Sequence, residues 1–281
     1  MNQPRPHAGG ARDLVVLDPD HPGFRDEDYR RRRNAIARVA LDYAEGSPVP
    51  AVTYTEGEQR VWQTVWEHLG PLHDRYACAA YRACSAIVAL DRRRVPQLAD
   101  VNATLERVTG FRMLPVAGLV SSPTFLSYLG RSVFLATQYM RHESRPLYTP
   151  EPDVVHELVG HAATFCHPGF ADLNRRFGRA ALSADEATLA KLDRMYWYTL
   201  EFGAVREEGA LKVYGAGLLS SFGELARFES HATLAPLDPD RVVATPYDPT
   251  DYQRHVFVAE SFDAMLRDVT AWIDSLPVHA A

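Results

Sequence analysis

In this 281-residue chain, His156 and His161 lie five residues apart. This spacing is the clearest indication of a chemical site in the sequence. Neutral imidazole is the commonest side-chain metal ligand, so one short helix can deliver both rings to a single ion. On an ideal α-helix, however, an interval of five residues turns through about 140°. We therefore expect a helix that begins at Pro152, a residue suited to the first turn, and ends near His161, where the backbone freedom of Gly160 lets the two rings converge.

A third ligand is expected from Glu201, further along the chain. The apolar spacing over residues 187–202 predicts a largely buried helix that Gly203 ends. A carboxylate in such a helix is costly to bury unless a cation or an arginine pairs with it. Two histidines and one carboxylate with open positions are typical of non-haem Fe(II) oxygenases. The sequence therefore predicts an iron site at His156, His161 and Glu201.

The composition is that of a soluble globular protein, with 46% hydrophobic and 23% charged residues. A net charge of -6 argues against a nucleic-acid-binding surface, and no apolar run is long enough to indicate a membrane span or an export signal. Three cysteines without a paired pattern indicate reduced thiols in a cytoplasmic protein. We expect a mobile tail over residues 1–13 and a single catalytic domain over residues 14–281.

The hydrophobic periodicity predicts a mainly α fold with many helices and a few short strands. The expected helices cover residues 26–45, 56–69, 76–90, 98–108, 122–138, 152–161, 170–182, 187–202 and 263–275. Short strands are expected over residues 211–214 and 242–245.

Several longer motifs surround the candidate ligands. They occupy residues 20–24, 109–112, 115–119, 138–142, 149–161, 196–203, 214–225 and 258–262. Together these motifs resemble the catalytic domain of the tetrahydrobiopterin-dependent aromatic amino acid hydroxylases, over about residues 20 to 277. The resemblance implies that family's fold. It also implies Fe(II), tetrahydrobiopterin or a related tetrahydropterin as cofactors, O2 as co-substrate and an aromatic L-amino acid as substrate.

A flat pterin needs an aromatic platform and backbone hydrogen bonds. By the family pattern, Phe125 is the platform, and Glu157 and Tyr196 approach the pterin from the metal side as catalytic residues. The full set expected at the pterin is Gly118, Leu119, Val120, Ser122, Phe125, Glu157 and Tyr196. Taken alone, Phe125 is equally consistent with core packing and Glu157 with an exposed helix acid.

The carboxylate of an amino acid needs a bidentate arginine, and the resemblance gives this role to Arg141. A structural ion pair is the alternative for Arg141. Arg33 ends a run of four arginines at residues 30–33, a pattern that predicts a solvated helix face. The resemblance implies instead that Arg33 pairs with Glu151. The set expected at the substrate is Arg141, Thr149, Pro150, Trp197, Phe202, Gly217 and Ser220, of which Thr149 and Ser220 support the arginine and a ligand histidine.

Phenylalanine, converted to tyrosine, is the favoured substrate, because the bulky Trp197 leaves less room for tryptophan. Tyrosine or tryptophan as substrate, and meta-hydroxylation of phenylalanine to meta-tyrosine in a biosynthetic pathway, stay open. Leu135 and Pro123 replace polar residues of the animal pattern, which makes the expected pterin pocket less polar and leaves the native pterin open.

Two other classes of protein are also consistent with parts of the sequence. One is a zinc hydrolase with Glu157 as general base, although the five-residue interval counts against it. The other is a non-catalytic protein that binds a pterin or an amino acid. Because the matching region contains neither the regulatory domain nor the tetramerisation helix of the animal enzymes, we expect a monomer whose partners are small molecules.

Overall fold

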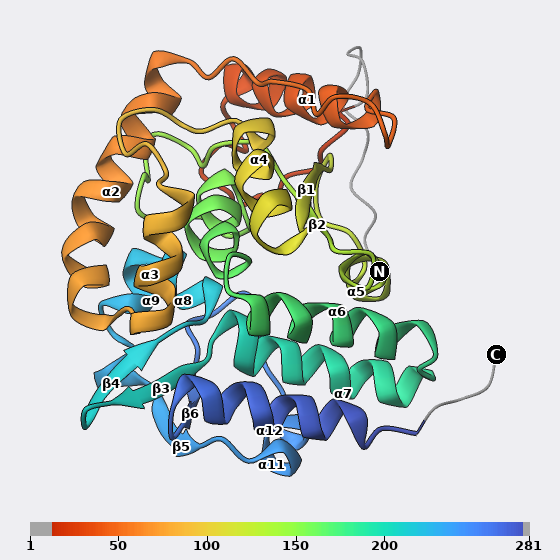
Figure 1. Cartoon of the computed structure of the whole chain (residues 1–281). Helices are drawn as coiled ribbons and strands as arrows, with labels where there is room; N and C mark the ends of the chain where they lie inside the picture. The colour runs from red at the N-terminus through yellow and green to blue at the C-terminus, as the bar shows by residue number, and fades with distance from the viewer. Residues whose placement is uncertain (1–12, 278–281) are drawn as a thin grey trace.

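The computed structural model describes residues 13–277, and helices make up most of it, beside two small sheets (Figure 1). This confirms the mainly α class with a few short strands. Of the predicted tail over residues 1–13, all but Asp13 lies outside the described residues. The single catalytic domain over residues 14–281 stays a prediction.

The amino-terminal half contains the first four predicted helices. They are α1 (Glu27–Leu41), α2 (Glu56–Tyr76), α3 (Ala79–Val88) and α4 (Leu98–Thr109). α2 begins with a capping box in which Thr55 and Glu58 each accept the other's backbone N–H. Apolar residues then recur at three- and four-residue intervals and are buried, namely Val61, Trp62, Val65, Trp66 and Leu69. This buried stripe fixes α2 against the core and continues beyond the predicted end at residue 69.

The predicted helix over residues 122–138 is wrong in its second half. The chain there forms α5 (Ser122–Leu129) and then β2 (Val133–Ala136), which pairs in parallel with β1 (Arg112–Pro115). α5 ends where it meets α6 (Pro168–Leu182): a Cβ on Gly130 would lie 3.1 Å from the backbone of Gly178. β2 is wholly apolar and buried, and so short an apolar run fits a strand and a helical turn equally well.

The larger sheet has the strand order β4-β3-β6-β5. Its strands are β3 (Ala204–Glu207), β4 (Ala210–Val213), β5 (Thr233–Pro236) and β6 (His255–Ala259). β3 and β4 form a hairpin whose turn residues, Glu208 and Gly209, both have positive φ, 51° and 80°. The predicted strand over residues 211–214 is therefore present as β4, whereas β5 and β6 have no counterpart in the prediction.

The predicted strand over residues 242–245 is wrong, because residues 242–244 lie in α11 (Pro239–Ala244). Asp238 accepts the first backbone N–H groups of this helix and Pro239 occupies its first turn, so the Asp-Pro pair is a helix start signal. The remaining carboxyl-terminal helices are α8 (Ala216–Ser220), α9 (Phe222–Leu225), α10 (Phe228–His231) and α12 (Phe262–Asp274).

Both elements that carry the candidate metal ligands are π-helical. They are η1 (His156–Ala162) and η2 (Trp197–Glu201), the second of which extends α7 (Glu186–Tyr196). η1 packs against α8, and α6 contacts both α7 and α12 in the lower part of the molecule (Figure 1). The fold therefore holds the two ligand-bearing segments inside its core.

Candidate metal centre

The two histidines converge because their helix changes its hydrogen-bonding pattern, and not because it ends. The backbone is helical from Val154 to Thr164, so the helix begins two residues after the predicted start at Pro152 and continues past the predicted end near His161. In the π-helical part, i→i+5 hydrogen bonds turn residues five apart towards one side. Gly160 serves a different purpose: a Cβ there would lie 2.7 Å from the carbonyl oxygen of Ala216, so glycine lets α8 approach the helix closely.

The side chains of His156, His161 and Glu201 meet at one point. The distance between the two Nε2 atoms is 3.0 Å, and Nε2 of His161 lies 3.0 Å from Oε1 of Glu201. Nε2 of His156 lies 3.6 Å from Oε2 of Glu201, and the three candidate ligand atoms all lie within 4.8 Å of one another. Adjacent ligands of an octahedral ion, at bond lengths near 2.1 Å, are about 3 Å apart. The two imidazoles, and His161 with Glu201, therefore have the spacing of neighbouring ligands on one octahedral ion.

The protonation states are also those of metal ligands. Burial lowers the pKa of His156 to about 4, which leaves its ring neutral at neutral pH. Burial alone would raise the pKa of Glu201, but the neighbouring His161 and His156 hold it below its usual value, so the carboxylate is ionised. A neutral imidazole beside a carboxylate is what a divalent cation requires.

A serine fixes the tautomer of His156. Oγ of Ser220 lies 2.9 Å from Nδ1 of His156 and donates its own hydrogen to the carbonyl oxygen of Ala216 at 2.7 Å. A hydroxyl has one hydrogen to donate, so Oγ must accept from Nδ1–H. The lone pair of His156 is therefore on Nε2, which faces the other two donors.

Arg141 forms a buried ion pair with Asp153. Its Nε and Nη2 atoms donate to the two carboxylate oxygens, each at 2.8 Å. Asp153 also accepts the backbone N–H of His156 at 3.2 Å, as a helix-capping residue does. The structural ion pair considered for Arg141 is thus present. The edge of the guanidinium between Nη1 and Nη2 takes no part in this pair. Asp153 was missed from the sequence, although an Asp three residues before the first histidine is a capping signal.

The arginine run does not form a uniformly solvated face. Arg33 is 2% exposed, and its Nη1 donates to Oε1 of Glu151 at 2.9 Å. This confirms the pairing that the resemblance implied. The pair ties α1 to the loop before η1, which contains Thr149 and Pro150. Thr149 donates its hydroxyl to the carbonyl oxygen of Glu151 at 2.7 Å, and Pro150 is exposed.

The residues expected at the pterin fall into two groups. Gly118, Leu119, Val120 and Ser122 lie at the start of α5 or just before it, and Leu119 is 72% exposed. Phe125 packs edge-on against Phe134 and Tyr196, with ring centroids 5.4 and 5.5 Å apart. The phenol of Tyr196 is buried and donates to Oδ1 of Asn174 at 3.3 Å. Asn174 was not predicted, because its separation from Tyr196 along the sequence gives no local signal.

Glu157 is buried, so the alternative of an exposed helix acid is wrong. Its Oε1 accepts from the backbone N–H and the hydroxyl of Thr137, at 3.1 and 2.9 Å. Burial raises the pKa of Glu157 to about 7. The carboxyl group is therefore poised to gain or lose a proton near neutral pH.

The aromatic residues expected at the substrate lie beside Glu201. The rings of Trp197 and Phe202 are 4.7 Å apart and tilted by 39°. Phe202 also packs on Gly217, where a Cβ would lie 2.5 Å from the ring. These contacts bring the carboxyl end of η2 and the start of α8 together.

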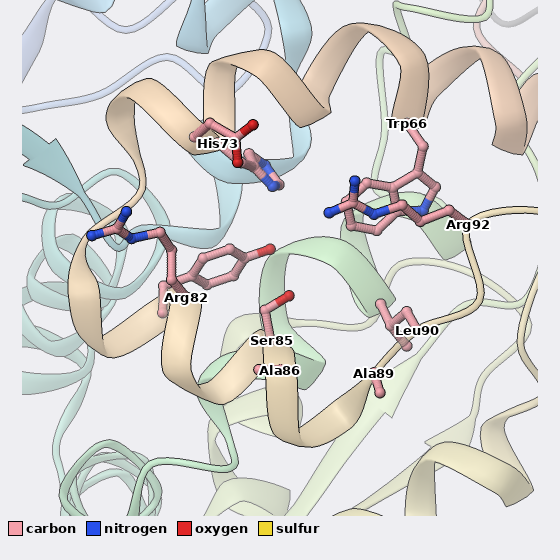
Figure 2. Close-up of a pocket in the computed structure, with 10 residues that line it drawn as sticks. Trp66, His73, Arg82, Ser85, Ala86, Ala89, Leu90 and Arg92 are labelled. Carbon is pink, nitrogen blue, oxygen red and sulfur yellow. The ribbon is translucent and has the colours of Figure 1, made fainter.

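A groove of about 320 Å³ lies between α2 and α3 (Figure 2). Within residues 13–277, its lining includes none of the predicted site residues. Two residues of this groove bind the backbone of the elements that carry His156, His161 and Ser220. The hydroxyl of Tyr81 donates to the carbonyl oxygen of Val159, and Nε2 of His73 donates to the carbonyl oxygen of Leu219, each at 2.7 Å. These supports were missed because they join segments far apart in the sequence.

The fold and the donor set define a helical protein with a two-histidine, one-carboxylate metal site. The chain belongs to the biopterin-dependent aromatic amino acid hydroxylases, whose family model matches residues 13–279. It is 42% identical over 266 residues to the phenylalanine-4-hydroxylase of Mus musculus, which corresponds to 93% of this chain and 59% of that protein. The tyrosine 3-monooxygenase of Mus musculus is also 42% identical, over 251 residues, 88% of this chain and 50% of that protein. The chain thus spans less than two thirds of these relatives.

Solved structures show the same fold. Phenylalanine hydroxylase from Chromobacterium violaceum, with bound iron(III) and 7,8-dihydrobiopterin, has a TM-score of 0.75 and 27% identity, and the match covers 87% of this chain and 94% of that one. The phenylalanine hydroxylase of Legionella pneumophila has a TM-score of 0.75 and 28% identity, over 83% and 91% of the two chains. In the part of the chain that the structure describes, every helix is too short or too polar to span a membrane.

Removing the hydroxyl of Ser220 should weaken metal binding. Ser220→Ala frees the His156 ring to take the other tautomer, and loss of such a support typically costs 10 to 100-fold in metal affinity, here about tenfold or more. Anaerobic titration with Fe(II) measures the change. Ser221→Ala is the matched control, because that hydroxyl faces the backbone of Glu224. Equal affinities of the Ser220→Ala variant and the unsubstituted protein would contradict this role.

Glu157 should link the stability of the metal-free protein to pH. Its pKa is raised from 4.5 to about 7, so its contribution is complete below pH 4.5 and is lost as the pH rises through 7. Glu157→Gln cannot titrate. Between pH 5 and 8 the unsubstituted protein should therefore lose up to about 3 kcal/mol of unfolding free energy relative to the variant.

Urea denaturation of both proteins in the presence of a chelator measures this difference. His156 acts in the opposite sense, because its lowered pKa removes stability as the pH falls from 6.5 towards 4. That effect is common to both proteins and cancels in the comparison. Parallel curves for the two proteins would show that Glu157 does not titrate in this window.

Proposed function

We propose that this chain is a non-haem iron, tetrahydropterin-dependent monooxygenase that hydroxylates the ring of an aromatic L-amino acid. Phenylalanine, converted to tyrosine, is the proposed substrate. The observation that carries the proposal is the facial arrangement of His156, His161 and Glu201, with ligand atoms within 4.8 Å of one another, in a chain of this family.

The residues present fit an iron ion. Two imidazoles and one carboxylate on one face of an octahedron leave the opposite positions open, as non-haem Fe(II) oxygenases require. When bound, the iron and the tetrahydropterin supply the electrons and the oxygen-activating centre for ring hydroxylation. Ser220 keeps Nε2 of His156 available, and Asp153 caps the helix that carries both histidines.

The proposed pterin site lies between α5 and the metal ligands. Phe125 is the aromatic platform, with Glu157 and Tyr196 between it and the metal. The backbone of Gly118, Leu119, Val120 and Ser122 borders the ring. Since Thr137 holds Oε1 of Glu157, the other oxygen of this carboxyl is the atom that exchanges a proton near the pterin.

The proposed substrate site starts at Arg141. Asp153 fixes the plane of its guanidinium, and the edge between Nη1 and Nη2 binds the amino acid carboxylate. Thr149 and Ser220 are proposed to support Arg141 and the ligand His156 at this end of the substrate site. The substrate ring packs among Pro150, Trp197, Phe202 and Gly217. The indole of Trp197 narrows the space, which favours phenylalanine over tryptophan.

The direct test is an assay of the anaerobically Fe(II)-loaded protein with tetrahydrobiopterin and oxygen. Phenylalanine, tyrosine and tryptophan are offered separately, and each product is identified by chromatography. We expect tyrosine from phenylalanine, and no product when the pterin or the iron is omitted. Turnover with zinc and no oxygen uptake, or ligand binding without any turnover, would contradict the proposal in favour of a hydrolase or a binding protein.

Single substitutions should separate the roles in this assay. His156→Ala and His161→Ala should abolish iron binding. Arg141→Lys retains a charge for Asp153 but loses the bidentate edge, so it should keep iron and raise the KM for phenylalanine by about tenfold or more. Arg145→Lys, at an exposed arginine nearby, is the matched control. Unchanged kinetics of Arg141→Lys would exclude the carboxylate role.

A further inference from the structure

The indole of Trp197 is restrained by residues 245–254, which in the described structure form neither helix nor strand. This segment joins α11 to β6. It contributes two side chains, those of Tyr247 and Gln253, that contact Trp197 directly. The Trp197 side chain, which is proposed to pack against the substrate ring, is therefore oriented by residues outside the helix that carries it.

Tyr247 restrains the plane of the indole. The two rings are stacked in parallel, with centroids 4.1 Å apart and an angle of 10° between their planes. The hydroxyl of Tyr247 donates to Oδ2 of Asp193, a residue of α7 one turn before Trp197. Tyr247 is thus anchored to the helix whose π-helical extension carries the indole, so its ring cannot slide away from Trp197.

Gln253 restrains rotation of the indole within that plane. Nε1 of Trp197 donates to Oε1 of Gln253 at 2.8 Å. The orientation of the amide is defined, because its Nε2 faces the carbonyl oxygens of Asp248 and Asp251 at 3.4 and 3.3 Å. The backbone N–H of Gln253 also donates to Oε1 of the buried Glu224 at 3.0 Å.

A third ring completes the arrangement. Phe202 contacts Trp197 with centroids 4.7 Å apart, and it directly follows Glu201 in the sequence. The stack, the hydrogen bond and this contact together leave the indole one orientation relative to the metal ligands. Because protein interiors are closely packed, the orientation of a side chain restrained on several sides also restrains a group that packs against it, here the proposed substrate ring.

We propose that Tyr247 and Gln253 are positioning residues that fix the plane of Trp197 and thereby select which carbon of the substrate ring is hydroxylated. The inference rests on the proposed function. The para and meta carbons of the ring are directly bonded and thus one bond length apart, so a small tilt of the Trp197 indole is enough to exchange one for the other. Misplacement by about 1 Å commonly changes reactivity by two orders of magnitude.

The test compares products of the Fe(II)-loaded protein with those of Tyr247→Leu and Gln253→Leu. Tyr247→Leu removes the stack, and Gln253→Leu removes the hydrogen bond to the indole. The ratio of meta- to para-tyrosine and the amount of amino acid hydroxylated per pterin oxidised are measured. Each variant should raise the minor product relative to the major one by on the order of tenfold and lower the hydroxylation yield per pterin.

Tyr198→Phe is the matched control. The hydroxyl of Tyr198 donates to the carbonyl oxygen of Pro246 at 2.8 Å, so this variant loosens the same segment without removing a contact to the indole. Its product ratio should equal that of the unsubstituted protein. Tyr247→Phe, which keeps the stack but loses the bond to Asp193, should shift the ratio less than Tyr247→Leu does.

The outcomes separate the two proposals. Iron content and melting temperature establish that each variant is folded and loaded. Turnover by all variants with an unchanged product ratio would overturn the positioning role while leaving the proposed function intact. A shift of equal size in Tyr198→Phe would also overturn it, because it would assign the effect to the segment as a whole. Absence of any hydroxylated product from the unsubstituted protein would overturn the proposed function and the inference with it.

Discussion

The candidate metal site depends on a departure from α-helical hydrogen bonding in the helix that carries both histidines. His156 and His161 would lie about 140° apart around an α-helix, whereas in η1 their Nε2 atoms are 3.0 Å apart. A π-helical turn is rare, so the surrounding packing must favour it. Because Gly160 has no side chain, α8 can pack closely against this π-helical turn. The hydroxyl of Tyr81 donates to the carbonyl oxygen of Val159, which belongs to the same turn. The second ligand-bearing segment, η2, is π-helical as well and ends at Glu201.

Around this turn, buried hydrogen bonds connect the candidate ligands to neighbouring elements. Asp153 joins Arg141 to the backbone of His156, and Ser220 joins the same histidine to α8. Breaking one half of a buried ion pair such as Arg141 and Asp153 typically costs about 3–5 kcal/mol. The same contacts that stabilise the fold therefore also orient the candidate ligands.

The sequence was sufficient for most helices, because a buried helix face repeats every three or four residues, and it singled out the three side chains that converge, His156, His161 and Glu201. It failed where a pattern is ambiguous or a contact is long-range. The apolar run of β2 fits two structures, and nothing in the spacing of η1 distinguishes a π-helix from a helix that ends. Partners such as Asn174 for Tyr196 and Leu219 for His73 lie 22 and 146 residues away. Such contacts exist only once the tertiary structure has formed.

The central claim is that η1 and η2 present two imidazoles and one carboxylate to a single iron. X-ray absorption at the iron edge of the anaerobically Fe(II)-loaded protein tests it most directly. The account predicts one iron per chain with only nitrogen and oxygen ligands, and scattering that fits two imidazole rings. A fit that requires one imidazole, or a sulfur ligand, would contradict the convergence of His156 and His161 on one ion.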